Sequence, residues 1–305
     1  MSADAPAARP PFAQRLAEAE VRAGSLLCVG LDPDPSRFPM GWAGQPQRIL
    51  DFCRAIVDAT ADLVLAYKPQ IAYFAAHRAE DQLEDLIDHI RRVAPAVPVI
   101  LDAKRGDIGS TAEQYAREAF ERFDADALTL SPYMGRDSIE PYLAYEGRGL
   151  FLLCRTSNPG GADLQQRVLA AEPGGSAPPE RLYEAVARLA AGEWNTAGNL
   201  GLVVGATVPA EIARVREIAP ALPLLIPGVG AQGGDAEATV VAGLRRDAAG
   251  RTTGAVAINS SRAVLYASRG DDFAQAARRV ADQTRRQLNA AAAAAAMASG
   301  VDGRA

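Results

Sequence analysis

The sequence is poor in the residue types that build metal centres and disulfide frameworks. Its 305 residues include 3 cysteines and 2 histidines. Cys28, Cys53 and Cys154 lie far apart and form no C-x-x-C pair, which argues against a zinc site or a disulfide framework and fits a reducing cytosol. His77 and His89 fall in charged, helical stretches and are not spaced as metal ligands. These patterns predict a cytoplasmic protein without a metal centre.

Long apolar runs and basic blocks are also missing. No stretch approaches the roughly 20 apolar residues of a membrane span, and no apolar signal core follows the Ala/Pro-rich N-terminus. The net charge is −5 and no basic block occurs, which argues against nucleic acid as a partner. Hydrophobic residues make up 49% of the chain, enough to bury a large core. We therefore expect a globular protein that binds neither membranes nor nucleic acid.

Eight short apolar runs alternate with helical patterns along the chain. Because these runs are continuous, they are typical of parallel strands that are buried on both faces. Eight strand–helix repeats predict a (β/α)₈ TIM barrel, with a doubly wound open sheet as the alternative. No G-x-G-x-x-G follows the first strand, which weakens that alternative. The expected strands are 26–31, 63–67, 97–101, 127–130, 149–154, 200–204, 222–226 and 254–258.

The rest of the chain is expected to complete a single barrel domain. Residues 1–11 predict a loose N-terminal arm, 12–288 form the core, and the Ala run of 289–305 predicts a fraying extension of the last helix with little to bury. One connection, 158–199, is long and contains two Pro-Gly-Gly turns, which is typical of a functional lid or a disordered loop. The expected helices are 46–59, 83–93, 110–123, 179–192, 209–219 and 236–248.

Charged residues follow the first three expected strands at their carboxyl ends, where the chemistry of a barrel is found. Asp32 follows the first strand, Lys68 the second, and Asp102 and Lys104 the third. The last two are two residues apart, so on a strand they point to the same side. We expect an alternating array of charge across the barrel mouth, with Asp107 just beyond it. A lysine between carboxylates stays protonated and can deliver a proton, although a structural salt-bridge cluster is the alternative.

The last two expected strands run into a candidate phosphate site. The loop at 227–235 is rich in glycines that expose backbone N–H groups, and its Gln232 adds an amide donor. Arg262, after the eighth strand, can bind a phosphate with two parallel hydrogen bonds. These two loops form the usual phosphate site of such barrels, and a tight turn is the alternative for the glycine-rich loop alone. After the fifth strand, the Ser157 hydroxyl can read a carbonyl or imide edge, and a role as a helix cap or turn residue fits it equally well.

Taken together, these motifs resemble the orotidine 5′-phosphate decarboxylase family in its longer bacterial form. The resemblance implies a (β/α)₈ barrel that works as a homodimer with a shared active site. It also implies conversion of orotidine 5′-monophosphate to UMP and CO₂, in pyrimidine biosynthesis, without a metal or an organic cofactor. The matching stretches are Gly-Leu-Asp-Pro-Asp at 30–34, Tyr-Lys-Pro-Gln at 67–70, Leu-Asp-Ala-Lys-Arg-Gly-Asp-Ile-Gly-Ser-Thr at 101–111, Ser-Asn-Pro-Gly at 157–160, Pro-Gly-Val-Gly-Ala-Gln-Gly-Gly-Asp at 227–235 and Ser-Ser-Arg at 260–262.

The resemblance implies catalytic roles for residues on the third strand and the segment after it. Lys104 is the expected proton donor to C6 of the pyrimidine, and Asp102 is expected beside the substrate carboxylate. Asp107 and Thr111 are expected to serve the partner subunit's site. Lys68 joins the charge network and contacts the ribose.

The remaining roles concern substrate binding. Asp32 is expected at the ribose and Gln232 and Arg262 at the phosphate, and Ser261 is a further expected substrate-binding residue. Ser157 is the expected reader of the pyrimidine, and its neighbour Thr156 leaves that assignment open. The short form of the family lacks the long insertion after the fifth strand, so the resemblance assigns no role to that segment.

Three other functions are compatible with parts of the pattern. A keto-sugar phosphate decarboxylase of the same barrel superfamily shares D-x-K-x-x-D and uses Mg²⁺. A Schiff-base aldolase would use Lys68 or Lys104 as a nucleophile, but neighbouring carboxylates keep such an amine protonated. A binding protein that retains only the phosphate site would not need the charged array.

Overall fold

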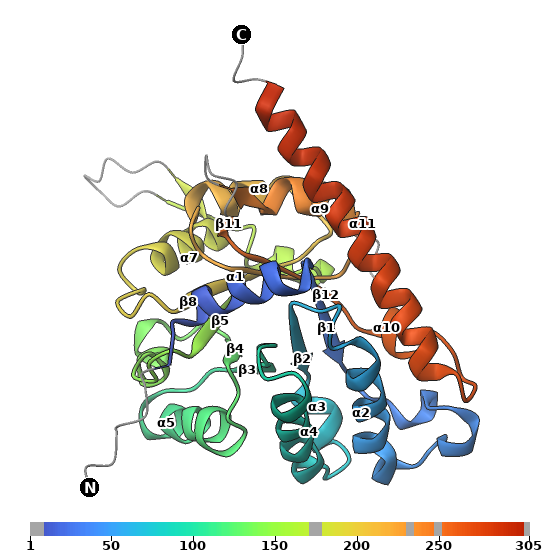
Figure 1. Cartoon of the computed structure of the whole chain (residues 1–305). Coiled ribbons are helices and arrows are strands. Elements are labelled where there is room, and N and C mark those ends of the chain that lie inside the picture. The colour runs from blue at the N-terminus through green and yellow to red at the C-terminus, as the bar shows by residue number, and fades with distance from the viewer. Residues whose placement is uncertain (1–8, 171–178, 230–234, 247–251, 302–305) are drawn as a thin grey trace, which may run out of the picture.

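The core of the molecule is a closed sheet of eight parallel strands. The computed structural model describes residues 9–170, 179–229, 235–246 and 252–301. The strand order is β2-β1-β12-β9-β8-β5-β4-β3, and backbone bridges from Tyr67 to Val99 and from Gln70 to Asp102 join β2 to β3. The expected barrel is therefore confirmed and the open doubly wound sheet is wrong (Figure 1). The strands are β1 Leu27–Leu31, β2 Ala66–Pro69, β3 Ile100–Arg105, β4 Ala127–Leu130, β5 Gly149–Arg155, β8 Leu200–Val204, β9 Leu224–Pro227 and β12 Val256–Ser260.

Each expected strand corresponds to an observed one, and the ends differ by a few residues. The largest difference is β3, which the apolar run predicted to end at Leu101 and which continues to Arg105. Strand pairing is made by backbone groups, so β3 pairs with β4 again at Arg105, after a register shift that follows Leu101. The candidate catalytic residues of this segment thus belong to the strand itself.

Helices surround the barrel and connect consecutive strands, as Figure 1 shows. Most of the expected helices are present with similar ends, but the helix expected at 110–123 ends as α5 at Arg117 and continues as a π-helical turn, Glu118–Arg122. The helices are α1 Phe12–Ala23, α2 Ile49–Thr60, α3 Ile71–Ala75, α4 Glu80–Val93, α5 Gly109–Arg117, α6 Glu140–Leu143, α7 Leu182–Ala191, α8 Pro209–Ile218, α9 Ala236–Gly243, α10 Arg262–Leu265 and α11 Phe273–Val301.

Helix α1 covers the amino-terminal end of the barrel, opposite the candidate site. Phe12 packs edge-on against Phe151 of β5, with ring centroids 5.7 Å apart. A Cβ atom at Gly149 would lie 2.3 Å from the Phe12 ring, so glycine is required for this contact. Together with Leu16 and the inward residues of the strands, Phe12 forms a second buried cluster inside the barrel. The amino-terminal end is therefore filled by side chains.

The helix expected at 236–248 is shorter than predicted. Helix α9 ends at Gly243, and the chain turns into a small antiparallel pair, β10 Arg245–Arg246 and β11 Thr252–Gly254. The fully buried guanidinium of Arg216 donates from Nε to the Gly243 carbonyl at 2.7 Å and from Nη2 to the Gly254 carbonyl at 3.1 Å. The bond to Gly243 satisfies a carbonyl group that a longer helix would have satisfied itself.

The Ala run near the C-terminus continues the last helix. Helix α11 extends to Val301, packs against α2 and α9, and projects beyond the body of the molecule (Figure 1). Its first Ala-rich turn is in contact with α1, because Asn289 Nδ2 donates to the Gly24 carbonyl at 2.6 Å and Ala291 is buried.

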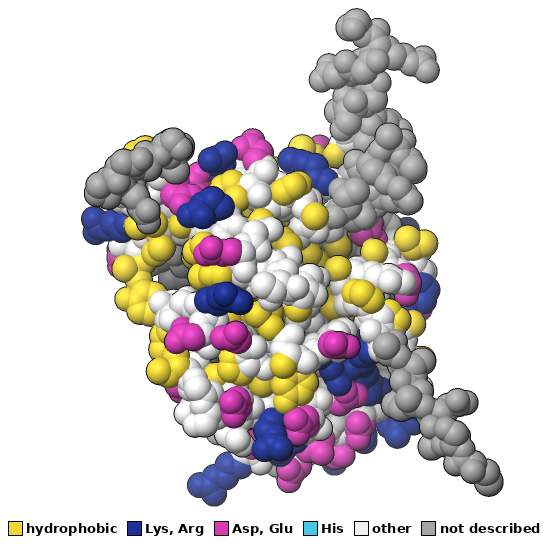
Figure 2. Space-filling model, turned by 90° about the vertical axis from the view of Figure 1, so that its left-hand side faces the viewer, with side chains coloured by type: hydrophobic (Ala, Val, Ile, Leu, Met, Phe, Trp, Pro, Cys, Tyr) yellow, Lys and Arg dark blue, Asp and Glu magenta, His cyan; other side chains and the backbone are white. Residues whose placement is uncertain are grey.

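The long connection after β5 contains a short antiparallel pair. Strand β6, Val168–Leu169, pairs with β7, Glu180–Arg181, and the helix expected from 179 begins at Leu182 because β7 precedes it. On the face shown in Figure 2, acidic and basic side chains are interspersed with apolar ones. None of the described helices is long and apolar enough to cross a membrane.

Candidate active site

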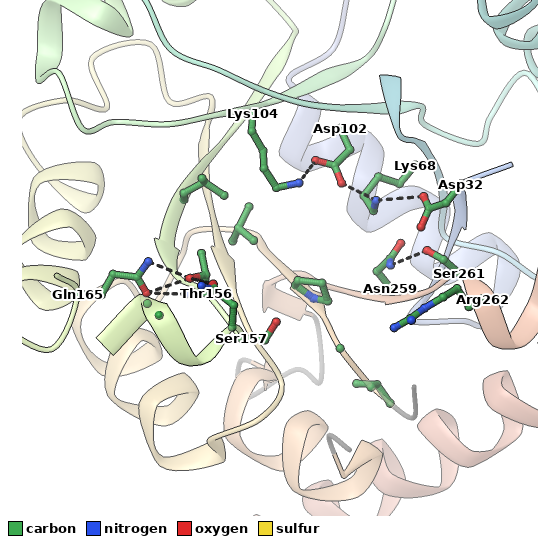
Figure 3. Close-up of a pocket in the computed structure, with 18 of the residues that line it drawn as sticks. Asp32, Lys68, Asp102, Lys104, Thr156, Ser157, Gln165, Asn259, Ser261 and Arg262 are labelled. Carbon is green, nitrogen blue, oxygen red and sulfur yellow. Dashed lines mark hydrogen bonds and ion pairs between the residues drawn. The ribbon is translucent and has the colours of Figure 1, made fainter. Parts of the chain in front are cut away.

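A cavity of about 570 Å³ opens at the carboxyl ends of the strands. It brings together seven of the predicted site residues, namely Asp32, Lys68, Asp102, Lys104, Ser157, Ser261 and Arg262 (Figure 3). Two others, Asp107 and Thr111, do not line it. Gln232, with most of its glycine-rich loop, lies outside the described residues. Leu153 and Val203, on β5 and β8, form part of the apolar wall.

Four charges of alternating sign form a row across the cavity (Figure 3). Asp32 Oδ1 lies 4.0 Å from Lys68 Nζ, which lies 2.7 Å from Asp102 Oδ2. The second oxygen of Asp102 lies 2.6 Å from Lys104 Nζ. At an effective dielectric of about 20, a pair about 4 Å apart gains about 4 kcal/mol, so the row holds its members firmly. The expected array is present, and Asp102 is shared by both lysines.

Burial and neighbouring charges shift the pKa values of Lys68 and Asp102 in opposite directions. Burial by itself would lower the pKa of Lys68, but the carboxylates of Asp102 and Asp32 outweigh it and hold that pKa above its ordinary value. Burial would likewise raise the pKa of Asp102, but Lys68 and Lys104 hold it well below its usual range. Both groups are therefore ionised at neutral pH. The side chain of Lys104 is 46% exposed, so its ammonium is accessible from the cavity.

Lys104 reaches Asp102 through an irregular backbone. We expected the two side chains to share a side because strand residues alternate, but Lys104 has φ +46°, a left-handed conformation that is uncommon for residues other than glycine. Leu101 pairs with Leu128, whereas Arg105 pairs with Leu130, so β3 bulges between them. The expected contact between Lys104 and Asp102 is present, and it is made across this bulge rather than along a regular strand. The backbone N–H groups of Ala103 and Lys104 donate to Thr129 Oγ1, a contact that the sequence motif gave no reason to expect.

Asp32 is held by its backbone, which leaves its side chain turned to the cavity. The Tyr266 hydroxyl donates to the Asp32 carbonyl at 2.7 Å and accepts from the N–H of Asp34 at 2.6 Å. Among the described residues, Asp32 Oδ1 and the nearby Asn259 Oδ1 are buried acceptors without a hydrogen-bond donor. Asp32 Oδ1 faces Lys68 Nζ at 4.0 Å, and the unpaired acceptor of Asn259 beside the row suits a ligand that carries a hydroxyl group.

Ser261 and Arg262, at the start of α10, lie beside Asn259 at the Asp32 end of the row, away from Lys104 (Figure 3). Asn259 Nδ2 donates to Ser261 Oγ at 3.2 Å. A Cβ atom at Gly30 would lie 1.9 Å from Ser261 Oγ, so the glycine of the first motif makes room for this side chain. Pro227 to Val229 also line this end. Arg262 is exposed and lines the cavity, which places a cation there for an anionic group.

The segment after β5 forms the opposite wall. Gln165 accepts the N–H of Thr156 at 2.8 Å and donates to its hydroxyl at 2.9 Å, while that hydroxyl also contacts Asn158. A Cβ atom at Gly205 would lie 2.7 Å from Ser157 Cβ, so the glycine that follows β8 allows this turn to pack closely. Thr156 and Ser157 both line the cavity, and the Thr156 hydroxyl is engaged within the loop. Leu164 and Gln165 show that the insertion itself lines the cavity.

Asp107 lies in the loop after β3, and Thr111 lies in the first turn of α5. Asp107 Oδ1 accepts the N–H of Ile108 at 2.9 Å, and Thr111 is exposed on α5. Ile108 is 51% exposed, and on the loop after β4 Tyr133 is 79% exposed. Neither predicted residue reaches the cavity of its own subunit.

The described residues contain no group of three or more histidine, cysteine, aspartate or glutamate side chains placed to hold a metal ion. Asp102, the most buried carboxylate of the cavity, already binds two ammonium groups, which would repel a divalent cation. The three cysteines are buried free thiols, and burial raises the pKa of Cys28 to about 12. His89 pairs with Asp58 at 2.6 Å, away from the cavity.

Comparison with known proteins finds the same family along most of the chain. Residues 25–280 match the model of the orotidine 5′-phosphate decarboxylase / HUMPS family. The chain is 70% identical over 284 residues to the orotidine 5′-phosphate decarboxylase of Leptothrix cholodnii, covering 93% of this chain and 99% of that protein. It is 68% identical over 280 residues to that of Methylibium petroleiphilum, covering 92% and 99%.

Solved structures agree with these relatives. The structure of Leishmania donovani OMP decarboxylase is 40% identical and superposes with a TM-score of 0.74, covering 91% of this chain and 99% of that one. A putative orotidine-monophosphate decarboxylase from Toxoplasma gondii is 33% identical, with a TM-score of 0.78, covering 92% and 97%.

Proposed function

The chain belongs to the orotidine 5′-phosphate decarboxylase family and is a decarboxylase of pyrimidine biosynthesis, and we propose that Lys104 is its proton donor. The reaction is the conversion of orotidine 5′-monophosphate to UMP and CO₂, without a cofactor. The observation that carries this proposal is the Asp32–Lys68–Asp102–Lys104 row, which ends in an accessible ammonium.

The chemistry requires a cation at the reacting carbon. The bond from C6 to the carboxylate breaks, CO₂ leaves, and the electron pair remains on C6, where the pyrimidine ring delocalises it poorly. The Lys104 ammonium stabilises this charge as it develops and then gives its proton to C6. The neutral amine regains a proton from water. Lys104 is suited to this role because Asp102 fixes its position while leaving the ammonium accessible.

Asp102 and Lys68 set the electrostatics around this step. Asp102 remains ionised because its pKa lies well below the usual range, so it places negative charge beside the substrate carboxylate and favours its departure. Lys68 keeps Asp102 oriented and contacts the ribose together with Asp32, which also lines the cavity. A Schiff-base function for Lys68 is disfavoured because its raised pKa keeps it protonated.

The phosphate and the base occupy opposite walls of the cavity. Arg262 and Ser261 bind the phosphate, with Gln232 as the further donor that the family resemblance implies. Ser157 reads the pyrimidine edge. The phosphate lies far from the bond that breaks, and its binding energy lowers the barrier by ordering the site around the reacting carbon.

The working unit in this proposal is a homodimer with shared sites. Asp107 and Thr111 lie outside the cavity of their own subunit, Ile108 between them is 51% exposed, and Tyr133 on the loop after β4 is 79% exposed. A contact through this surface would carry both residues to the partner's cavity. This arrangement accounts for their position better than a role within one subunit.

The test follows the absorbance of orotidine 5′-monophosphate with purified protein in EDTA. Rapid loss of absorbance with the wild type, and none with Lys104→Ala, supports metal-free decarboxylation with Lys104 at its centre. Turnover that requires added Mg²⁺ would reject the cofactor-free reaction. The absence of turnover from a folded protein under both conditions would reject the substrate.

A further inference from the structure

Strand β3 carries two extra residues opposite β4, at the point where its catalytic side chains lie. Leu101 pairs with Leu128 and Arg105 pairs with Leu130, so three residues of β3 face Thr129 alone. Such a bulge displaces N–H groups from the carbonyls that would accept them in a regular ladder. Here the N–H groups of Ala103 and Lys104 donate to Thr129 Oγ1 at 3.0 and 2.9 Å. A side-chain hydroxyl thus replaces the missing backbone acceptors.

The same hydroxyl binds the catalytic carboxylate. Thr129 Oγ1 donates to Asp102 Oδ1 at 3.0 Å, the oxygen that also accepts from Lys104 Nζ at 2.6 Å. A hydroxyl offers one donor and two acceptor positions, and all three are used. Thr129 is 1% exposed, so water would not replace it. One buried atom therefore fixes the backbone at Lys104 and the carboxylate that orients its ammonium.

The backbone of Lys104 needs such a restraint. Its φ of +46° is a conformation that residues with a side chain adopt only when the surrounding structure imposes it. The bulge and the two hydrogen bonds to Thr129 impose it here. Without them the segment would relax toward a regular strand and carry the ammonium of Lys104 away from its present direction.

We propose that Thr129 is a positioning residue for the decarboxylation proposed above, and that its hydroxyl holds Lys104 where it can protonate the substrate. The inference rests on that proposed function. Thr129 does not line the cavity, so it acts through Asp102 and Lys104. The alternative is that Thr129 only fills the barrel wall, in which case its methyl group and volume matter and its hydroxyl does not.

The experiment compares variants that separate the hydroxyl from the volume. Thr129→Val keeps the shape and removes the hydroxyl, while Thr129→Ser keeps the hydroxyl and removes the methyl group. Thr239→Val is the matched control, because Thr239 is fully buried in α9 and its hydroxyl has no partner among the described residues. For each protein we would measure kcat and KM with orotidine 5′-monophosphate and the Kd of UMP by calorimetry, which also counts the folded sites.

In Thr129→Val we expect kcat per folded site to fall on the order of 10- to 100-fold, the usual effect of a small misplacement of a reacting group. KM and the Kd of UMP should stay within about threefold, since the phosphate and ribose contacts are unchanged. Thr129→Ser and Thr239→Val should keep kcat within about threefold of the wild type.

Two results would overturn the positioning role. One is an unchanged kcat in Thr129→Val, and the other is a loss in Thr129→Ser as large as that in Thr129→Val. If Thr129→Val yields no folded protein, Thr129→Ala removes the same hydroxyl and enters the same comparison. A wild type that binds UMP but fails to consume orotidine 5′-monophosphate would refute the proposed function itself. An active wild type whose kcat is matched by Thr129→Val would refute only the positioning role.

Discussion

Replacing Asp102 by asparagine removes the negative charge that two ammonium groups share. The carboxylate oxygens lie 2.7 Å from Lys68 Nζ and 2.6 Å from Lys104 Nζ. Lys104 is about half exposed, so water can solvate it when its partner is lost. The Lys68 side chain is 5% exposed, and its remaining carboxylate among the described residues is that of Asp32, at 4.0 Å. Asp102→Asn therefore leaves a buried and poorly compensated ammonium in the barrel.

Breaking a buried ion pair by removing one partner destabilises a protein by about 3–5 kcal/mol. We expect Asp102→Asn to lower the free energy of unfolding by about 3 kcal/mol, at the low end of this range. The loss is limited because Asp32 remains and the amide oxygen still accepts a hydrogen bond from Lys68. Lys68→Met removes the cation and leaves Asp102 with Lys104. In the double variant both charges are gone. We therefore expect its loss of unfolding free energy to be smaller than the sum of the two single losses, by at least about 2 kcal/mol.

The assay is urea unfolding of the wild type, both single variants and the double variant, at one protein concentration and pH 7. Asp62→Asn is the matched control, since Asp62 pairs with Arg278 at 2.6 Å on the surface and such pairs contribute within about 1 kcal/mol. The reasoning fails if Asp102→Asn lies within about 1 kcal/mol of the wild type and adds independently to Lys68→Met.

The difference in unfolding free energy between wild type and Asp102→Asn depends on pH, in a way that follows from the directions of the pKa shifts of Asp102 and Lys68. The lowered pKa of Asp102 gives stability that is present above the unfolded value of about 3.9 and is lost as pH falls through the folded pKa. The raised pKa of Lys68 gives stability that is present below about 10.4 and is lost as pH rises through the folded pKa. The difference between wild type and Asp102→Asn should be constant near neutral pH and shrink below about pH 4.

Four further predictions concern the reaction. Lys104→Ala should lower kcat by at least on the order of 10²–10⁴-fold while its circular dichroism matches the wild type, and substantial turnover in a contaminant-free preparation would remove Lys104 as proton donor. Arg262→Ala should lower kcat/KM on the order of 10- to 100-fold, because a charged hydrogen bond contributes about 1.5–3 kcal/mol; an unchanged value would reject the phosphate contact. Mixing inactive Lys104→Ala with inactive Asp107→Ala should restore activity through one intact hybrid site, and no recovery despite demonstrated subunit exchange would contradict the shared site. Tyr266→Phe should raise KM several-fold, about 1 kcal/mol for the lost hydrogen bonds to the Asp32 segment, and steady-state kinetics with an unchanged KM would show that this segment is held by other contacts.

The sequence was informative about the barrel because parallel strands are buried on both faces. Continuous apolar runs such as those ending at Leu31 and Leu130, separated by helical patterns, are typical of strands in that environment. Strand ends were less predictable: β3 continues to Arg105 because backbone pairing does not depend on the polarity of the side chains. The helix expected to 248 ended at Gly243, where a buried arginine from α8, Arg216, binds its last carbonyl. Local helix propensity cannot predict such a tertiary partner.

The candidate site was likewise predictable in part. Charged residues at successive strand ends predicted the Asp32–Lys68–Asp102–Lys104 row, since parallel strands bring their carboxyl ends to one edge. The left-handed backbone of Lys104 was not predictable, because it arises from a register shift against a strand more than twenty residues away.

The sequence by itself therefore determined the barrel, the family and the identity of the charged groups, because these follow from local patterns and motifs. Only the tertiary structure decided how those groups are held. Thr129 acts through hydrogen bonds across a bulge, Gly30 leaves space for Ser261, and Asp107 lies outside the cavity of its own subunit. Each of these depends on distances between segments that are remote in the chain, and such distances exist only once the barrel has closed.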